Sequence, residues 1–380
     1  MNVVFVCSGT AGHVNPALAI ANELKNEQAN ILFIGAGRDM ENKLVGAAGF
    51  DLVNIKMSGL MRKPSLKMIA HNIKTVKNLL SAKRAVLEIF DKFQPDVVIG
   101  TGGYVCYPVI KAASKRKIPA VIHESNVSPG LSIKLLSATV DNVLTSFPEV
   151  ASKYKKPERV IYTGTPVLSK SIGEKKNPPR ETTASGKPLI VSFWGSLGAR
   201  RMNDMMPQFI QLLIKDGSFR LIHAAGTAGD AERIKEKTHR LTGMDTLPDY
   251  VEVRQYIDDM PDVLSAADIA LCRAGGATIG EIIAYNKPSV LIPSPYVSNN
   301  EQEENALWLE QIGAAVVLQE KNCNGEVLYK KAASILGDKS KCGEMSKALS
   351  TISRPDAASF IADYVISLAN KHKAQKQQSR

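Results

Sequence analysis

The sequence predicts an α/β fold built from two doubly wound parallel sheets. Short apolar runs alternate with longer amphipathic stretches along the whole chain, which is typical of buried parallel strands joined by crossover helices. The length of 380 residues exceeds the usual size of one domain and is sufficient for two cores. Glycine-rich turns directly follow apolar runs in both halves of the chain.

The apolar runs predict strands in both halves. They are short, bounded by turn residues and rich in Val, Ile and Leu, as strands buried on both faces of a sheet are. In the first half they span residues 3–7, 31–35, 96–101, 120–124, 143–146 and 160–164, and in the second half residues 189–194, 220–225, 251–256, 269–273, 289–293 and 314–317.

The chain is predicted to divide at residues 166–187, an interdomain linker rich in Lys, Pro, Ser and Thr and without periodicity. An N-terminal domain of residues 1–165 precedes this linker, and a C-terminal domain of residues 188–353 follows it. Apolar residues at helical spacing predict a helix over 354–370 that packs back on one of the domains. The polar residues 371–380 are predicted to be a disordered basic tail.

Composition limits the class of protein. The net charge of +11 indicates an anionic partner, and an aromatic content of 6% without a recognition motif argues against nucleic acid. No run of about 18 apolar residues could span a bilayer, and the N-terminus has no signal-peptide pattern, so export is not expected. Five scattered cysteines without a CxxC pair, and no histidines at ligand spacing, predict a reducing compartment and neither metal nor cofactor.

The glycine-rich turns comprise residues 8–13, 100–104, 194–200 and 273–278. Each can bring backbone amides to a ligand at a helix N-terminus, where the dipole favours anionic groups; a helix is predicted to begin near Asn15. The first turn lacks GxGxxG spacing, and an ordinary strand-to-helix turn is the alternative. Ligands of open parallel sheets bind beyond the carboxyl ends of the strands, so these turns together predict one sugar-nucleotide cleft between facing domains.

Polar residues near these turns are candidates for binding sugar hydroxyls. Residues 123–126 end a predicted strand and suit hydroxyl binding or proton transfer, with a self-satisfied polar turn as the alternative. Glu281 follows the fourth turn by one helical turn and can accept two ribose hydroxyls; dipole stabilisation is its alternative. Gln302 and Asn305 open another helix and can bind a hexose or act as solvated caps.

Taken together, residues 3–317 resemble the MurG family of GT-B glycosyltransferases. The matching segments are GTAGHVNPALAIANEL, DVVIGTGGYVCYPV, IPAVIHESNVSPGLSIKLL, FWGSLGARRMN and YIDDMPDVLSAADIALCRAGGATIGEIIAYNKPSVLIPSPY. The resemblance implies a GT-B fold whose two Rossmann-like domains face each other across a cleft. It also implies an inverting transferase that moves N-acetylglucosamine from UDP-N-acetylglucosamine to undecaprenyl-diphospho-N-acetylmuramoyl-pentapeptide (lipid I), forming lipid II in peptidoglycan synthesis.

Carried over residue by residue, the resemblance implies a site with contributions from both halves. His13 and Glu124 are implied to be catalytic, and Gly103, Tyr104, Glu124 and Asn126 to contact the acceptor. The implied donor-binding residues are Thr10, Ala11, Gly12, Asn126, Leu168, Ser196, Ile257, Gly276, Ala277, Thr278, Ile279, Glu281 and Gln302.

Five of the donor residues carry specific implied roles. Ser196 is implied to bond a phosphate, Ile257 to present its backbone to uracil, and Thr278 to lie at the diphosphate. Glu281 is implied to hold the ribose, and Gln302 the N-acetylglucosamine hydroxyls.

The chain departs from the family pattern at several positions. Two of the losses remove a donor-side charge and an amide, for which Arg200, Arg273 or Lys170 are candidates to compensate. Leu168 stands where Arg is usual, Thr165 and Ile133 where Asn is usual, Leu197 where Gln is usual, and Ala11 where Gly is usual.

The implied reaction is attack by the acceptor's 4-hydroxyl on the anomeric carbon as UDP leaves, giving a β-1,4 linkage. His13 is the preferred general base because an imidazole titrates near neutrality, and Glu124 is the alternative. Loop amides and a helix N-terminus would stabilise the leaving diphosphate, so no metal is required.

An amphipathic segment predicts contact with an anionic membrane surface. Its apolar residues lie at the spacing of one helix face, and its cations favour interfacial binding; a helix that merely covers the sheet is the alternative. We therefore expect a cytoplasmic protein, peripheral on the cytoplasmic face of the plasma (inner) membrane, with cell-wall synthesis and division proteins as candidate partners. The residues are Ile69, Ile73, Val76 and Leu80, with Lys67, Lys74, Lys77, Lys83 and Arg84.

Other functions remain as alternatives. A GT-B enzyme with a different acceptor, of processive or antibiotic type, or a UDP-N-acetylglucosamine epimerase would share this architecture. A catalytically silent sugar-nucleotide-binding protein is a further alternative, because Leu168 and Thr165 replace polar groups. Donor and product assays distinguish these.

Overall fold

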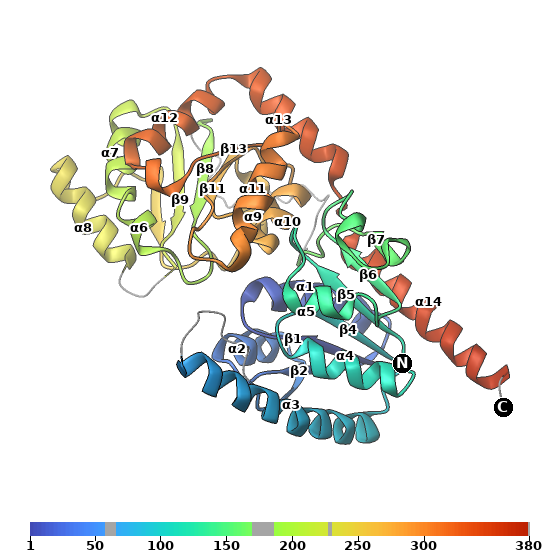
Figure 1. Cartoon of the computed structure of the whole chain (residues 1–380). Coiled ribbons are helices and arrows are strands. Elements are labelled where there is room, and N and C mark those ends of the chain that lie inside the picture. Colours follow the sequence, from blue (N-terminus) through green and yellow to red (C-terminus); the bar gives the residue numbers. More distant parts are fainter. Residues whose placement is uncertain (58–65, 169–185, 227–229, 379–380) are drawn as a thin grey trace. The chain divides into compact units, whose positions relative to one another are not determined.

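The computed structural model describes residues 1–57, 66–168, 186–226 and 230–378. The chain forms two compact units. Unit 1 comprises Met1–Leu168 together with Arg354–Arg380, and unit 2 comprises Ser169–Ser353. Each unit contains one parallel sheet covered by helices, so the prediction of two Rossmann-like domains is confirmed (Figure 1). The predicted linker falls mostly on residues 169–185, outside the described residues.

Unit 1 contains a seven-stranded parallel sheet in the order β3-β2-β1-β4-β5-β6-β7. Its strands are β1 (Asn2–Cys7), β2 (Asn30–Gly35), β3 (Asp51–Asn54), β4 (Val97–Gly102), β5 (Ala120–Glu124), β6 (Asn142–Thr145) and β7 (Val160–Tyr162). Its helices are α1 (Ala11–Asn26), α2 (Asp39–Ala47), α3 (Leu66–Phe93), α4 (Cys106–Lys115), α5 (Leu131–Leu136) and α14 (Ala357–Gln378), with 3-10 turns η1 (Ala151–Lys153) and η2 (Pro157–Arg159).

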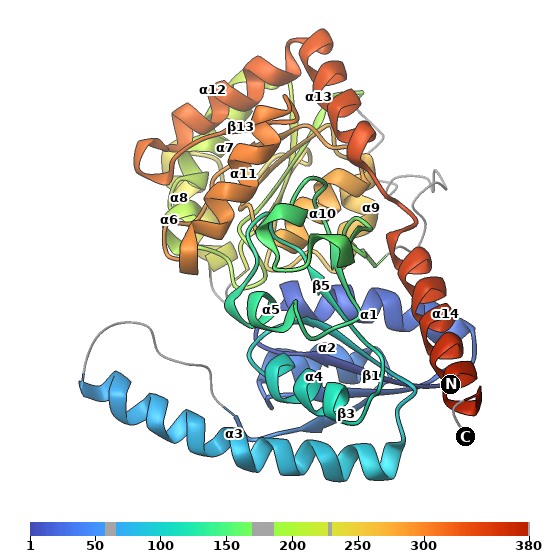
Figure 2. The same ribbon diagram turned by 45° about the vertical axis from the view of Figure 1, so that its right-hand side comes forward.

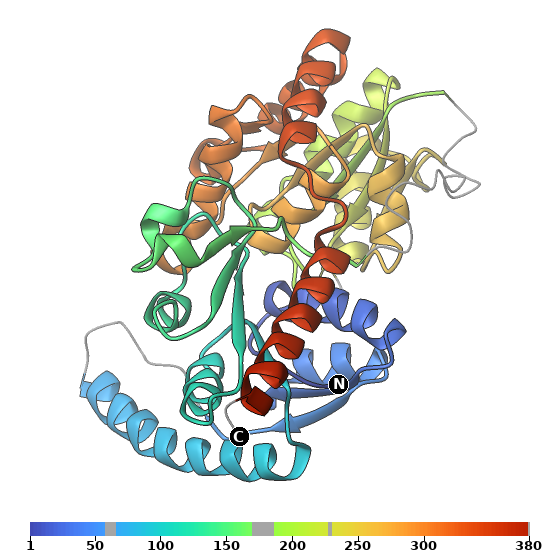
Figure 3. The same cartoon turned by 90° about the vertical axis from the view of Figure 1, so that its right-hand side faces the viewer.

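The core of unit 1 lies between the sheet and the helices α1 and α14. Val3 and Phe5 of β1 are completely buried there, and so are Ile361 and Val365 of α14. The last helix therefore packs on α1 of this unit, as Figure 2 and Figure 3 also show. Burial on both faces of the central strands explains why their sequences are continuous apolar runs.

Unit 2 contains a six-stranded parallel sheet in the order β10-β9-β8-β11-β12-β13. Its strands are β8 (Leu189–Phe193), β9 (Arg220–Ala224), β10 (Val251–Arg254), β11 (Ile269–Cys272), β12 (Ser289–Leu291) and β13 (Ala315–Val317). Its helices are α6 (Arg200–Asn203), α7 (Met206–Asp216), α8 (Asp230–Thr242), α9 (Met260–Ala266), α10 (Gly276–Ala284), α11 (Glu301–Gln311), α12 (Gly325–Leu336) and α13 (Lys339–Ile352), with 3-10 turns η3 (Ser298–Asn300) and η4 (Glu320–Asn322).

All of the predicted strands are confirmed, with ends that differ by up to two residues. The strand β3, by contrast, was not predicted. It lies at the edge of the sheet and exposes Asp51, Val53 and Asn54, so its sequence lacks the continuous apolar run of a buried strand.

Two predicted helix boundaries are wrong. The helix α1 begins at Ala11 and not near Asn15, with Pro16 in its second turn, where the missing N–H leaves only the Gly12 carbonyl without its usual helical partner. The helix α14 continues to Gln378, through most of the segment predicted as a disordered tail. An ion pair of 3.0 Å between Lys373 and Asp96 ties this extension to the sheet.

Candidate functional site

Two glycine turns meet at the carboxyl edge of the sheet in unit 1. Ser8, Gly9 and Thr10 connect β1 to α1, and Gly102 and Gly103 connect β4 to α4. Since β1 and β4 are neighbouring strands, the turns lie side by side, and Ser8 N donates to Gly102 O at 3.2 Å. Thr10 precedes α1 without a side-chain cap on the helix amides, so the start of α1 is open to an external acceptor.

His13 is held by both turns. Its Nδ1 lies 2.7 Å from Ser8 O, so this nitrogen carries the proton and donates, and Nε2 keeps its lone pair. Thr101 Oγ1 donates to the His13 carbonyl at 2.7 Å. Burial lowers the pKa of His13, and an imidazole that is neutral at physiological pH can accept a proton through Nε2.

Gly102 makes room for this imidazole. Its φ is +125°, and a Cβ at this position would lie 2.4 Å from His13 Cδ2 and 2.8 Å from Nε2. Any side chain at residue 102 would therefore displace the ring.

Glu124 is the last residue of β5, the next strand in the sheet, and Asn126 follows that strand. Glu124 Oε1 accepts hydrogen bonds from Asn126 N at 3.0 Å and Asn126 Nδ2 at 2.9 Å, and Oε2 accepts from Gly130 N at 2.8 Å. The Glu124 carboxylate thus accepts hydrogen bonds from its own turn. This arrangement is the alternative that the sequence indicates for residues 123–126. By contrast, no hydrogen bond within the described residues engages His13 Nε2, so its lone pair stays available.

The remaining acceptor candidates lie in the same region. Gly103 and Tyr104 follow β4, and the guanidinium of Arg38 lies 5.9 Å from the centre of the Tyr104 ring. Ala11 and Gly12 form the first turn of α1 and are partly buried, and Leu168 is exposed at the end of unit 1.

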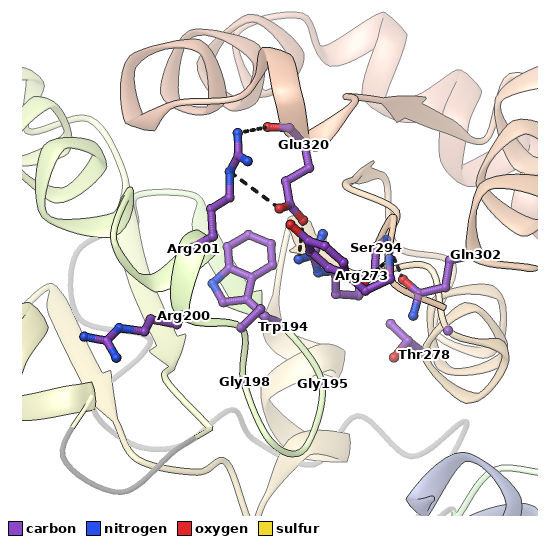
Figure 4. A pocket seen from close by; sticks show the side chains of 13 residues that line it. Trp194, Gly195, Gly198, Arg200, Arg201, Arg273, Thr278, Ser294, Gln302 and Glu320 are labelled. Carbon is purple, nitrogen blue, oxygen red and sulfur yellow. Dashed lines mark hydrogen bonds and ion pairs between the residues drawn. The ribbon is translucent and has the colours of Figure 1, made fainter. Parts of the chain in front are cut away.

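Unit 2 contains a cavity of about 470 Å³, drawn in Figure 4. It lies beyond the carboxyl ends of β8, β11 and β12, where ligands of open parallel sheets bind. Its lining comes from both glycine turns of this unit, from the start of α11 and from η4. The lining residues are Trp194, Gly195, Gly198, Ala199, Arg200, Arg201, Arg273, Gly275, Thr278, Ser294, Tyr296, Gln302 and Glu320.

The turn after β8 is pressed against the end of β9. Gly198 has a φ of +72°, and a Cβ there would lie 2.0 Å from Ala225 O, so only glycine is compatible with this contact. Ser196 is partly buried in the same turn, and Leu197 at its tip is 71% exposed. The contact between Gly198 and Ala225 holds the turn at the mouth of the cavity.

An ion-pair network, in which Arg273 and Glu320 are buried and Arg201 is half exposed, forms one wall of the cavity. Arg273 donates to Glu320 Oε2 at 2.6 Å and to Ile292 O at 3.0 Å, and Arg201 Nε lies 3.5 Å from Glu320 Oε1. Figure 4 shows Arg201 and Arg273 converging on Glu320, whereas Arg200 points away. Two guanidinium groups share one carboxylate, and the surplus positive charge suits an anionic ligand.

The N-terminus of α10 opens on the same cavity. Gly275 precedes the helix, no side chain caps its first amides, and no acidic residue lies in its first turn. The backbone of Gly276, Ala277 and Thr278 is therefore suited to hold an anion. Ile279 is completely buried, so it can meet a ligand only through its backbone.

Glu281 lies on α10 one turn further on and is partly buried. Burial raises its pKa to about 7. In the described part of the chain no hydrogen bond or ion pair engages its carboxylate, which is consistent with a place for ligand hydroxyls. Ile257, which follows β10, is buried as a side chain and can present only its backbone.

The two amides of α11 differ in their contacts. Gln302 Oε1 accepts from Ser294 N at 2.9 Å, and its Nε2 lies on the side of Gly275, at the cavity. Asn305 is completely buried and donates to Ala274 O at 3.0 Å. The prediction that Asn305 binds a hexose is therefore wrong, because this side chain supports the glycine turn.

The sequence interpretation missed several charged residues that shape these sites, namely Glu41, Arg201 and Glu320. Their side chains bond residues far away in the sequence, such as Gly9 for Glu41 and Arg273 for Glu320. Glutamate is rarely buried unless paired, and the neighbouring residues in the sequence do not indicate these distant partners.

The predicted membrane segment forms α3, which lies beside α4 (Figure 2). The side chains of Lys67, Ile69, Ile73, Lys74, Val76, Lys77 and Leu80 lie outside the described residues, while Lys83 and Arg84 are exposed and Arg84 pairs with Glu88 at 3.3 Å. No helix in the described residues is long and apolar enough to cross a bilayer. Within the same residues, no group of His, Cys, Asp and Glu side chains is arranged for a metal ion.

Two Rossmann-like units with glycine turns at their sheet edges define a GT-B type transferase fold. Residues 3–145 match the glycosyltransferase family 28 N-terminal domain, and residues 181–361 match the family's C-terminal domain. A relative from Caldanaerobacter subterraneus subsp. tengcongensis is 41% identical over 362 residues, or 94% of this chain and 97% of that protein. It is named UDP-N-acetylglucosamine–N-acetylmuramyl-(pentapeptide) pyrophosphoryl-undecaprenol N-acetylglucosamine transferase.

Solved structures agree with this relationship. The crystal structure of Acinetobacter baumannii MurG superposes with a TM-score of 0.73 at 26% identity, over 96% of this chain and 99% of that one. A UDP-N-acetylglucosamine 2-epimerase from Neisseria meningitidis reaches 0.64 at 13% identity, over 97% and 100%, and shares the fold alone. The chain belongs to glycosyltransferase family 28, and the resemblance to its MurG members is confirmed.

The packing of Gly102 against His13 generates a test of the geometry in unit 1. We expect Gly102→Ala to displace the imidazole and to destabilise the protein by about 1–3 kcal/mol, because a Cβ would overlap the ring in a positive-φ conformation. Gly49→Ala is the control, since Gly49 also has a positive φ but no atom within 4 Å of a Cβ. Urea unfolding and the NMR signals of the His13 ring measure the two effects. Unchanged His13 signals in Gly102→Ala would contradict the described packing.

Proposed function

We propose that the chain transfers N-acetylglucosamine from UDP-N-acetylglucosamine to undecaprenyl-diphospho-N-acetylmuramoyl-pentapeptide, forming lipid II for peptidoglycan synthesis. The observation that carries this proposal is 41% identity, over 94% of the chain, to a relative named for this donor and this acceptor. The two sites support it, because one is cationic and the other presents an imidazole with an available lone pair.

The donor binds in the cavity of unit 2 in this proposal. The amides of Gly276, Ala277 and Thr278 and the surplus charge beside Glu320 hold the diphosphate. Glu281 accepts the ribose hydroxyls, while Ser196 bonds a phosphate. The N-acetylglucosamine hydroxyls meet the amide of Gln302, and the backbone of Ile257 meets uracil. From unit 1, Thr10, Ala11, Gly12, Asn126 and Leu168 are the proposed further donor contacts.

The acceptor binds at the carboxyl edge of unit 1, against Gly103, Tyr104, Glu124 and Asn126. His13 Nε2 takes the proton of the 4-hydroxyl while its oxygen forms a bond to the anomeric carbon. The bond from that carbon to the diphosphate oxygen breaks, UDP leaves with the electron pair, and the anomeric configuration inverts. Helix-terminal amides and arginines stabilise the charge on UDP, so no metal takes part in the proposed step.

A transfer assay tests the activity directly. With radiolabelled UDP-N-acetylglucosamine and a lipid-linked muramyl acceptor analogue, we expect label in the lipid fraction. His13→Ala should lower kcat roughly 100- to 10,000-fold with little change in the KM for the donor, because the base acts only on the acceptor.

Each failure in this assay has a defined meaning. Label that stays in the aqueous fraction as the 2-epimer of the donor would indicate an epimerase. Label that stays as unchanged donor would refute the acceptor assignment. Equal turnover of wild type and His13→Ala would exclude His13 as the base.

The pKa of Glu281 makes donor binding dependent on pH. Because its pKa is about 7, the carboxylate is ionised above this pH and protonated below it, and the ionised form is the stronger acceptor, with both oxygens free of a proton. We expect the affinity for UDP-N-acetylglucosamine, measured by calorimetry, to fall as the pH decreases through 7. In Glu281→Gln, affinity should be low throughout and independent of pH; a variant that keeps the wild-type pH dependence would rule out this role.

Peripheral attachment to the cytoplasmic face of the plasma membrane is a second part of the proposal. It is supported by a lipid acceptor in the name of the relative and by the excess of Lys and Arg along α3. A basic amphipathic helix binds an anionic surface through its charges and its apolar face. Cell-wall synthesis and division proteins are the proposed neighbours there.

Vesicle sedimentation tests the membrane contact. Replacing Lys74 and Lys77 by Gln should lower binding to anionic liposomes at low salt, because each cation near the surface contributes about 1 kcal/mol. Replacing Lys339 and Lys347 of α13 by Gln is the charge-matched control and should leave binding unchanged. Equal losses in the two variants, or no binding by the wild type, would contradict a surface on α3.

A further inference from the structure

Glu41 is a buried carboxylate that connects two loops of unit 1. It lies in the first turn of α2 and is inaccessible to solvent. Its Oε1 accepts a hydrogen bond from Gly9 N at 2.6 Å. Its Oε2 accepts from the amides of the loop after β2, at 2.7 Å from Ala36 N, 3.1 Å from Gly37 N and 3.4 Å from Arg38 N.

These contacts surround the Glu41 carboxylate with hydrogen-bond donors. A buried charge is costly unless hydrogen bonds compensate it, and four backbone donors do so here. Gly35 leaves the space that the carboxylate needs, because a Cβ at this residue would lie 2.8 Å from Glu41 Oε2. Three of the four hydrogen bonds come from the loop that leads into α2. The fourth comes from Gly9, in the turn before His13.

The bond to Gly9 and the bond from His13 use the same peptide group. The peptide that joins Ser8 to Gly9 donates its N–H to Glu41 Oε1 at 2.6 Å, and its carbonyl, Ser8 O, lies 2.7 Å from His13 Nδ1. A carboxylate at the N–H end polarises a peptide and strengthens its carbonyl as an acceptor. A stronger acceptor holds the proton on Nδ1 and directs the lone pair to Nε2.

We propose that Glu41 is a positioning residue for the base, acting on His13 through the Ser8–Gly9 peptide in the way that a carboxylate orients a catalytic histidine by direct contact. This inference rests on the proposed function of His13. The carboxylate never touches a substrate in this arrangement. It keeps one tautomer and one ring orientation of the imidazole.

Few other charged groups surround this relay. The Glu41 carboxylate raises the pKa of His13 and opposes the larger effect of burial, which lowers it. The thiols Cys7 of β1 and Cys106 of α4 are neutral, because burial raises the pKa of both. The Arg38 guanidinium is exposed and lies over the Tyr104 ring, and its pKa is raised by Tyr104 and, to a smaller extent, by the negative charge of Glu41.

Glu41→Gln tests the relay in the full-length enzyme. We expect kcat to fall about 10- to 100-fold, the usual effect of removing an orienting partner. The KM for UDP-N-acetylglucosamine should change much less than kcat, because most of the proposed donor contacts belong to the cavity of unit 2. The acid limb of the pH profile of kcat/KM should move to lower pH, since loss of the negative charge lowers the pKa of His13. Asp39→Asn is the control, an exposed carboxylate of the same helix turn, and should match wild type.

A merely structural role of Glu41 predicts a different result. Glu41→Gln would then melt at a lower temperature but keep the wild-type kcat and pH profile, and this outcome would overturn the inference. If the wild type itself transfers no sugar, the proposed function fails and the relay is judged by NMR alone.

NMR of the imidazole nitrogens tests the relay without any need for enzymatic activity. In the wild type at neutral pH, His13 should be the tautomer protonated on Nδ1, with its signals assigned by their loss in His13→Gln. In Glu41→Gln, the tautomer mixture should gain the form protonated on Nε2. A wild-type His13 protonated on Nε2 would refute the relay.

Discussion

Backbone amides at the two ends of a parallel sheet have no strand partner, and their need for acceptors determines how both units are built. At the N-terminal ends of the strands, aspartates that precede a strand or its neighbour supply the acceptor. They anchor strands that are distant in the sequence, so the register of each sheet is held at the edge opposite the sites. The pairs are Asp96 with Asn2 N at 2.8 Å, Asp141 with Ala120 N at 2.8 Å and Asp268 with Leu189 N at 2.7 Å.

At the carboxyl ends the same need is met by longer side chains, and there it has consequences for chemistry. Glu41 satisfies two loops, Glu124 satisfies the turn after β5, and Gln302 satisfies the turn after β12. A turn whose amides are already bonded is rigid, so the groups that it carries are placed before a ligand arrives. At α10 the pattern stops, because no side chain caps the first amides after Gly275. The first amides of α1 also lack a side-chain cap, so both helix starts are open to an external acceptor.

The sequence was sufficient to predict the architecture because buried parallel strands must be apolar on both faces, and such runs are visible without any structure. The edge strand β3 escaped prediction because most of its side chains face water. Pro16 suggested a helix start that lies too late, since a proline is tolerated wherever one carbonyl can do without its partner. The glycine turns and Glu281 were recognisable from their place after strands. The contacts of Glu41 with Gly9 and of Glu320 with Arg273 were not, because these partners lie 32 and 47 residues away and a single sequence does not show which distant residues meet in space.

The residues that depart from the family pattern differ in what surrounds them. Ile133 is buried in α5, where an apolar side chain adds no polar group that would need a partner, and Leu197 lies at an exposed tip where a lost amide costs little. Leu168 is the departure with an electrostatic consequence, since it removes a charge from the side of the proposed donor. The wall formed by Arg201, Arg273 and Glu320 carries one positive charge more than it neutralises. In the proposed complex, unit 2 therefore supplies positive charge to the diphosphate from its own sheet edge, whichever side chain stands at residue 168.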